Sequence, residues 1–288
     1  MIAAEIAAAL GNARREGHAW RCRCPLHGGH SLVLADGRNA LLVKCWAGCD
    51  VRDVLAELHR LQLTSVDRRT EWAGQRFDDQ RDRARRIEIA RRIWDGARDA
   101  RGSLVACYIA SRGIIMPIPP SLRWAPSSRR PDGTHAPAML ARADSLDGEL
   151  IGVHRTYLDR DVAGLWHRRD RASLGPIAGG AVRLAPVAEM LLIGEGIETV
   201  LAAMQATGLP GWAALSTSGL KALLLPPEVR SAVICADNDD NGAGERAART
   251  AERRWRAEGR EVQIYISPYV GEDAADRLLA MSEARHAA

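Results

Sequence analysis

The stretch ICADNDDNGAGERAA, residues 234–248, decides the fold, because it passes from an apolar strand through an acidic turn into a helix. The apolar segment SAVICAD is typical of the end of a buried strand, and the residues from Gly242 onward have helical spacing. Asp237 and Asp239 lie between the two segments. Carboxylates crowded at this spacing repel one another, and a bound cation would relieve that repulsion.

The segments around this stretch alternate between strands and helices. Before it come the strand EMLLIG, the helix IETVLAAMQATG, the strand GWAALS and the short helix TSGLKALLLP, and after it comes the strand EVQIYISP. Strands that alternate with helices predict a parallel sheet. We therefore expect an α/β domain at residues 188–288, with a mostly parallel sheet flanked by helices.

Carboxylates from distant parts of the chain are expected to meet at one edge of this sheet. Glu195 follows the first strand, Asp237 and Asp239 follow a later one, and Asp273 follows the last. The carboxyl ends of parallel strands share one edge, where such sheets bind their ligands. Carboxylate oxygens favour Mg²⁺ or Mn²⁺ as the bound cation. The alternative is that acidic side chains stabilise helix N-termini. We prefer that interpretation for Glu198, Asp240 and Glu245.

A second metal site is predicted near the N-terminus, where four of the six Cys residues cluster. The ligand pairs are Cys24 with His27 and Cys45 with Cys49, separated by SLVLADGRNALLVKC, which predicts a hairpin with DGRN as its turn. Three thiolates and one imidazole form the closed tetrahedral site that is typical of structural Zn²⁺. Small ribbons bury too little surface to fold without their metal. Ordinary reduced Cys residues are the alternative.

Cys22 and His30 could compete for this metal, but Cys22 lies only two residues from Cys24, so we exclude both. The Cys distribution differs from a secreted disulfide framework and indicates a reducing compartment, so we expect a cytoplasmic protein. No apolar run reaches membrane-spanning length, and we expect no membrane partner. The N-terminal MIAAEIAAALGNARREG predicts a short amphipathic helix rather than a signal peptide.

The chain is long enough, at 288 residues, for several domains, and its net charge of +4 is compatible with a nucleic-acid partner. The helix DVRDVLAELHRLQL follows the Cys cluster, with Asp50 as its N-cap. Short apolar runs such as SLVACYIASRGI and ELIGVHRTYLD predict several strands in the middle of the chain. We expect a zinc-ribbon domain at 1–65, a charged linker and helix at 66–102, a mixed α+β domain at 103–187 and the α/β domain at 188–288.

These motifs resemble the Toprim domain, which bacterial-type primases, type IA and II topoisomerases and some nucleases share. LIGEGIETVLAA resembles its glutamate motif, ICADNDDNGAGERAA its DxD motif, and GEDAADRL a further acidic motif of primases, in which Glu272 replaces the usual Lys. CPLH and CWAGCD are similar to the zinc ribbon of bacterial and phage primases. The segments between the two regions also look like those of plasmid and prophage primase-like proteins, so the resemblance covers most of the chain.

The resemblance implies a DNA primase, a nucleotidyltransferase that makes short RNA primers from ribonucleoside triphosphates on single-stranded DNA. Asp237 and Asp239 would then hold Mg²⁺ on the triphosphate, and Glu195 would act as acid/base or as a further metal ligand. The sequence contains no Walker motif, so we expect any replicative helicase to be a separate partner. The alternatives are a Toprim nuclease and a non-catalytic nucleic-acid-binding protein.

Five residues are candidates for contact with nucleic acid or nucleotide. They are Arg38, Lys44 and Trp46 in the zinc ribbon, and His154 and Arg155 in the segment GVHRTYLD. Aromatic rings stack on bases and basic side chains bind phosphates. Packing on the ribbon is an equal alternative for Trp46, and plain exposure on the solvent face of an alternating strand is one for His154 and Arg155.

Overall fold

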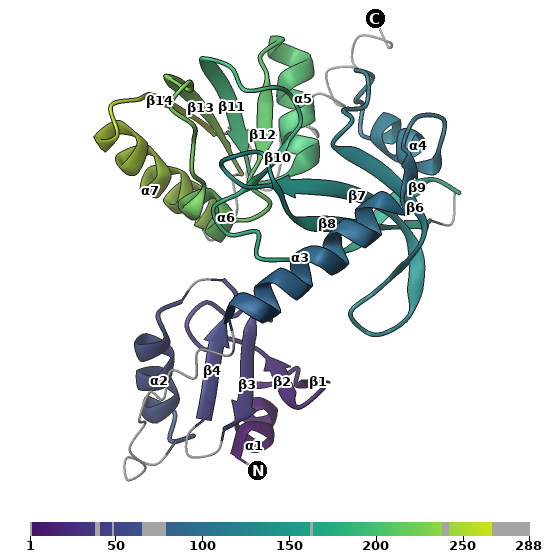
Figure 1. The fold of residues 1–288 in the computed structure, drawn as a ribbon. Coiled ribbons are helices and arrows are strands. Elements are labelled where there is room, and N and C mark those ends of the chain that lie inside the picture. The colour runs from purple at the N-terminus through teal and green to yellow at the C-terminus, as the bar shows by residue number, and fades with distance from the viewer. Residues whose placement is uncertain are drawn as a thin grey trace, which may run out of the picture. The chain divides into compact units, whose positions relative to one another are not determined.

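The computed structural model describes residues 2–37, 41–47, 49–64, 79–161, 164–237 and 242–266. The chain divides into two compact units, Met1–Asp78 and Asp79–Ala288. In the described residues, the first unit is built on a four-stranded sheet and the second on a ten-stranded sheet (Figure 1). None of the helices in this part of the chain has the length and apolar character needed to cross a membrane.

The first unit is an antiparallel sheet in which each strand pairs with the next, with two helices packed on it. Its elements are α1 (Ile2–Leu10), β1 (Arg14–Glu16), β2 (Ala19–Cys22), β3 (Leu32–Asp36), β4 (Leu41–Cys45) and α2 (Val51–Arg60). Asp50 caps α2, because its side chain accepts a hydrogen bond from the backbone N–H of Arg52. The hairpin predicted from the sequence is confirmed by the pairing of β3 with β4, although residues 38–40 of its turn lie outside the described residues.

The N-terminal helix is shorter than the quoted segment predicted. It ends at Leu10, and residues 14–16 instead form a strand that pairs with β2. Gly11 and Asn12 both have left-handed backbones, with φ of 83° and 53°, and a left-handed residue ends a helix. Strands β1 and β2 were not predicted from the sequence, because strands of three or four residues carry little periodic signal.

The second unit contains one sheet, which has an antiparallel part and a parallel part. Its first elements are α3 (Asp79–Asp95), β5 (Arg98–Asp99), α4 (Leu104–Ser111), β6 (Leu122–Arg129), β7 (His135–Asp144), β8 (Leu150–Arg160), β9 (Trp166–Leu174) and β10 (Ala181–Arg183). The later ones are β11 (Met190–Gly194), α5 (Ile197–Thr207), β12 (Gly211–Ala213), α6 (Thr217–Ala222), β13 (Ser231–Ala236), α7 (Ala243–Ala257) and β14 (Glu261–Ile266).

The strand order shows how the two parts join. Strands β14, β13, β11 and β12 run parallel to one another in that order, and β10 pairs antiparallel with both β12 and β7. Strands β5 to β9 are antiparallel, with β8 between β7 and β9. The predicted fold class, a small β unit followed by an α/β domain with a mostly parallel sheet, is therefore confirmed.

The segment SLVACYIASRGI is a helix rather than the strand that its apolar character predicted. Ser103 caps this helix, α4, by accepting a hydrogen bond from the backbone N–H of Val105. Val105, Tyr108 and Ile109 recur at helical spacing and are all buried in one core cluster. The capping serine and the 3–4 residue spacing are therefore the local features that favour a helix here.

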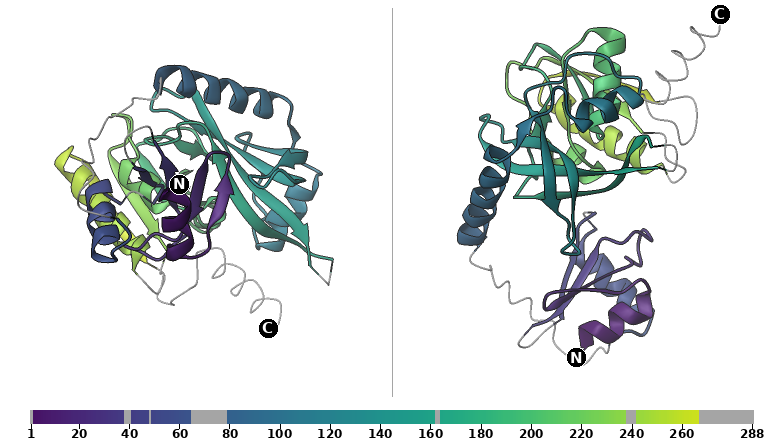
Figure 2. Two further views of the ribbon diagram at one scale, coloured as in Figure 1. Left: turned by 90° about the horizontal axis from the view of Figure 1, so that it is seen from below. Right: turned by 90° about the vertical axis from the view of Figure 1, so that its right-hand side faces the viewer.

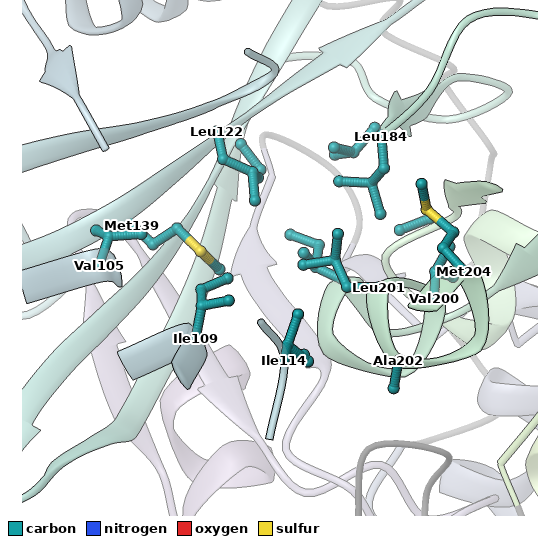
Figure 3. Packing of buried hydrophobic residues seen from close by; sticks show 14 of the residues in the cluster. Val105, Ile109, Ile114, Leu122, Met139, Leu184, Val200, Leu201, Ala202 and Met204 are labelled. Atoms are coloured by element: carbon teal, nitrogen blue, oxygen red, sulfur yellow. The ribbon is translucent and has the colours of Figure 1, made fainter. Parts of the chain in front are cut away.

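Helices pack on both faces of the sheet in the second unit. The side chains between these helices and the sheet form its core. Met139 and Leu122 of the sheet pack with α4 and with α5, as Figure 3 shows. Helix α3 lies along the opposite face of the sheet (Figure 2), where Trp94 belongs to the same buried cluster as Leu140 and Tyr157. Successive residues of β7, such as Met139 and Leu140, are therefore buried on opposite faces of the sheet.

Met139 and Met190 provide a test of this packing. Met139 is fully buried between α4 and the sheet, whereas Met190 at the start of β11 is 41% exposed. We predict that Met139→Ala lowers the free energy of unfolding by about 2–5 kcal/mol, because a cavity replaces the side chain. Met190→Ala should change it by less than about 0.5 kcal/mol. Urea unfolding measures both, and equal losses would contradict the packing described.

Candidate metal sites

Four side chains of the first unit form a cluster with the donor set of a zinc site. The ligand atoms of Cys24, His27, Cys45 and Cys49 all lie within 4.8 Å of one another. The sulfurs of Cys24 and Cys49 are 3.9 Å apart, and His27 Nε2 lies 3.3 Å from the sulfur of Cys45. Zinc–sulfur bonds of about 2.3 Å in a tetrahedron separate two sulfurs by about 3.8 Å. The donor types and their spacing therefore fit Zn²⁺.

Backbone hydrogen bonds bring the two halves of this cluster together. The N–H of Cys24 donates to the carbonyl of Gly29 at 2.8 Å, which closes the turn that carries His27. Cys45 is the last residue of β4 and lies opposite Leu32 of β3. The N–H of Trp46 donates to the carbonyl of Ser31 at 2.8 Å, so the second turn is fastened to the first.

The thiol pKa values show why the cluster needs a cation. Burial raises the pKa of the Cys45 thiol, but hydrogen bonds with Ser31 and His27 outweigh this and lower it to about 6. Burial and the neighbouring thiols raise the pKa of Cys49 to about 12, and that of Cys24 is raised mainly by burial. Three adjacent thiolates are therefore incompatible without a positive ion among them, and a bound metal would supply that charge.

Cys22 and His30, which the sequence analysis excluded, lie outside the cluster. Cys22 is fully buried at the end of β2, and burial together with nearby Cys24 raises its pKa to about 11. The ring of His30 lies 3.3 Å from the side-chain amide of Asn12. Neither residue therefore belongs to the cluster of four candidate metal ligands.

An aromatic and a basic side chain lie together beside the zinc cluster. Trp46 directly follows Cys45 and is 48% exposed, so much of its ring is accessible rather than packed in the core. The ammonium group of Lys44 lies 4.0 Å from the centre of the Trp46 ring. Arg38, the third residue predicted for this surface, lies outside the described residues.

The second site is at the carboxyl edge of the parallel strands. Strands β11 and β13 are neighbours, with Gly194 opposite Cys235. Glu195 directly follows β11 and Asp237 directly follows β13, so the register brings both residues to one edge. Glu195 Oε1 and Asp237 Oδ1 are both buried in the protein. Two carboxylate oxygens buried at adjacent strand ends have the chemistry of a hard divalent cation site, so the residues fit Mg²⁺ or Mn²⁺. Asp239 and Asp273 lie outside the described residues.

The backbone around Glu195 is held by the loop that follows β12. The N–H groups of Ala214 and Leu215 donate to the carbonyls of Gly194 and Glu195, each at 2.8 Å. Leu215 adopts a left-handed backbone, with φ of 70°, although it is a bulky residue. Such a conformation costs about 1–2 kcal/mol, so the surrounding contacts must enforce it. The loop after β12 therefore also contributes to this edge of the sheet, and the sequence pattern did not predict that contact.

Asp237 is held from the other side by the start of α7. A Cβ atom on Gly244 would lie 2.4 Å from the carbonyl oxygen of Asp237, which is closer than any real contact. Glycine at this position therefore lets the first turn of α7 approach the backbone of Asp237. Glu245, in the same turn, forms an ion pair with Arg249 at 3.6 Å.

His154 and Arg155 are not on a free face of the sheet. The expectation that one face of their strand meets solvent is wrong, because β8 is buried along most of its length. His154 Nδ1 lies 2.9 Å from the Ser173 hydroxyl, and burial together with nearby Arg171 and Arg155 lowers the pKa of His154 to about 3. Arg155 donates a 2.8 Å hydrogen bond to the backbone carbonyl of Arg129.

Loss of one zinc ligand should remove the metal and unfold the first unit. We predict that Cys45→Ser purifies with far less than one zinc per chain, because three ligands cannot close the tetrahedral site. Elemental analysis gives the metal content, and circular dichroism reports the folding. Cys107→Ser, at an exposed Cys outside the cluster, should keep its zinc and serves as the control. A fully zinc-loaded Cys45→Ser protein would contradict the assignment.

The close approach of α7 to Asp237 gives a separate prediction. Gly244→Ala should weaken binding of Mn²⁺ to the carboxyl edge by about tenfold, since the added methyl group displaces the backbone that carries Asp237. Isothermal titration of the zinc-loaded protein measures this affinity. Gly96→Ala is the control, because a Cβ atom there would lie 3.3 Å from the carbonyl oxygen of Arg92 and 4.0 Å from that of Ile93. Unchanged Mn²⁺ binding in Gly244→Ala would refute the role of this contact.

Two family models match parts of the second unit. Residues 190–284 match the Toprim domain family, and residues 84–184 match a domain of unknown function, DUF7146. A comparison with curated proteins found no significant match.

Several solved structures are similar to the chain at low identity. The Aquifex aeolicus primase (zinc-binding and RNA polymerase domains) has 16% identity and a TM-score of 0.44, over 99% of this chain and 82% of that one. A DNA primase domain from Pseudomonas aeruginosa has 16% identity and a TM-score of 0.45, over 70% and 77%. The primase fragment of the bacteriophage T7 primase-helicase protein has 15% identity and a TM-score of 0.42, over 67% and 78%.

The Toprim resemblance inferred from the sequence is thus confirmed by a family match to the same residues. Four parallel strands lie within residues 190–284, and Glu195 and Asp237 follow two adjacent ones. The second unit of this chain therefore contains a Toprim domain.

Proposed function

We propose that this protein is a DNA primase, which synthesises short RNA primers on single-stranded DNA from ribonucleoside triphosphates. The observation that carries the proposal is the position of Glu195 and Asp237 at the ends of adjacent parallel strands in a Toprim domain. The Cys₃His cluster in the preceding unit supports it, because a ribbon of this kind offers a surface for a template. A separate replicative helicase is the protein partner that we propose.

The carboxylates would carry out the metal-binding and proton-transfer parts of the reaction. A divalent cation bound there supplies positive charge that stabilises displacement at phosphorus. Asp237 and Asp239 would hold that cation, and Asp273 is a further ligand that we propose. Glu195 would be either another ligand or the base that takes the proton from the attacking 3′-hydroxyl. The buried position of Glu195 Oε1 supports a role that requires shielding from water.

The first unit would bind the template through the surface beside its zinc cluster. The exposed ring of Trp46 can stack on a base, which contributes about 1–3 kcal/mol per base. Lys44, which lies over the same ring, can pair with a phosphate, and Arg38 is the third residue that we propose here. We place the template contact in this unit rather than at His154 and Arg155, because those side chains bond within the sheet.

A nuclease is the second candidate, since the same carboxylates could cleave phosphodiesters. The Cys₃His cluster favours synthesis over cleavage, because cleavage needs no separate template-binding unit. One assay separates the candidates: the protein is incubated with Mg²⁺, single-stranded DNA and labelled ribonucleotides. New short oligomers identify a primase, shortened DNA identifies a nuclease, and DNA retardation alone identifies a non-catalytic binding protein.

Asp237→Asn tests the site within that assay. We predict that it lowers primer synthesis by at least about a hundredfold, because an amide cannot hold the cation that stabilises the displacement. Its melting temperature should stay near that of the parent, since asparagine has nearly the same size and shape as aspartate. Asp147→Asn, in the exposed turn between β7 and β8, is the matched control and should keep full activity. Full activity in Asp237→Asn would refute the assignment.

A further inference from the structure

A buried hydrogen bond links two helices of the second unit, and the proposed mechanism does not use it. The hydroxyl of Tyr108 in α4 donates to Glu198 Oε1 in the first turn of α5 at 2.7 Å. Tyr108 is 2% exposed and Glu198 is 6% exposed, so solvent does not compete for this bond. We propose that Tyr108 is a positioning residue, which fixes the first turn of α5 through Glu198 and thereby orients Glu195.

The first turn of α5 has no side-chain cap of its own. Gly196 is the N-cap residue of α5, and it forms no side-chain capping hydrogen bond. Glycine is an accepted N-cap residue, but it provides no side-chain contact that fixes the first turn. Gly196 alone separates Glu195 from that turn, so the position of the turn limits where Glu195 can lie. The contact from Tyr108 restricts the turn from outside the helix.

The chemistry of the pair favours a lasting contact. Burial is the main cause that raises the pKa of Tyr108, and adjacent Glu198 raises it further, so the phenol keeps its proton and remains a donor. Arg168 of β9 and Arg112 at the end of α4 oppose this shift but do not outweigh it. A hydrogen bond to a buried carboxylate is stronger than one between neutral groups.

A second contact fastens the opposite end of the same helix and provides an internal comparison. Gln205 Oε1 accepts hydrogen bonds from the backbone N–H groups of Ile115 and Met116, at 2.7 Å and 3.0 Å. Its Nε2 donates to the carbonyl of Gly113 at 3.0 Å. Between the two contacts, α4 and the loop after it pack on α5 through the shared core (Figure 3). Gln205 thus joins α5 to the loop after α4, at the end of α5 that is far from Glu195.

The inference rests on the part of the proposed function that places a divalent cation at Glu195, so its test measures metal binding. Isothermal titration calorimetry of the full zinc-loaded chain with Mn²⁺ gives the affinity. The same titration of Glu195→Gln identifies the part of the signal that comes from the carboxyl edge. We expect Tyr108→Phe to weaken Mn²⁺ binding by about tenfold, as for other groups that orient a metal ligand. Gln205→Met should leave the affinity within about twofold.

A double variant separates positioning from general stability. Tyr108→Phe leaves the Glu198 carboxylate buried without its phenol donor, so its melting temperature should fall. Adding Glu198→Leu removes that buried charge, and the melting temperature should recover at least in part. Mn²⁺ affinity should stay about tenfold weaker in the double variant, because leucine cannot restore the contact. Stability and affinity would then respond differently to the same pair of residues.

The outcomes keep this inference distinct from the proposed function. If Tyr108→Phe binds Mn²⁺ as the parent does while its melting temperature falls like that of Gln205→Met, the bond is only structural and the inference is overturned. The same holds if the parent shows no Mn²⁺ binding that Glu195→Gln removes. If Tyr108→Phe weakens Mn²⁺ binding but the parent makes no primers, the proposed function fails and the positioning role stands.

Discussion

The parallel pairing of β11 with β13 is the constraint on which the second unit depends. It brings Glu195 and Asp237, which are 42 residues apart in the sequence, to the ends of adjacent strands. Parallel strands are buried on both faces, so their edge is where polar side chains can gather without breaking the core. Helix α5 and helix α7 begin at this edge. Gly244 lets α7 approach the carbonyl of Asp237, and Gly194 at the end of β11 leaves room for Val200 of α5.

The two metal sites solve the same electrostatic problem in different ways. In the first unit, backbone bonds across two turns crowd three thiols and an imidazole. Burial raises the pKa values of Cys24 and Cys49, and the neighbouring thiols raise them further. In the second unit, the pairing of β11 with β13 brings two carboxylates to one edge, beside two extensive hydrophobic cores. A zinc ion in the Cys₃His cluster would therefore support a fold, whereas a divalent cation at the carboxyl edge would support a reaction.

Local signals predicted those elements whose pattern is carried by consecutive residues. The alternation from EMLLIG to EVQIYISP gave the parallel strands and their helices in the right order, since buried strands and amphipathic helices differ in period. The segment SLVACYIASRGI misled because a short apolar run suits either state, and tertiary packing on the sheet made it a helix. Strands β6 and β9 were missed because proline, serine and arginine obscure their alternation.

By itself, the sequence determined the order of elements from β11 to β14, the Cys and His spacing of the cluster and the place of Glu195 and Asp237 at strand ends, because each follows from neighbours in the chain. Only the tertiary structure decided that His154 is buried and that Tyr108 meets Glu198. Ninety residues separate that last pair, and no local pattern encodes a contact over such a distance. Its geometry depends on how α4 and α5 pack on one face of the sheet, which is a property of the whole core.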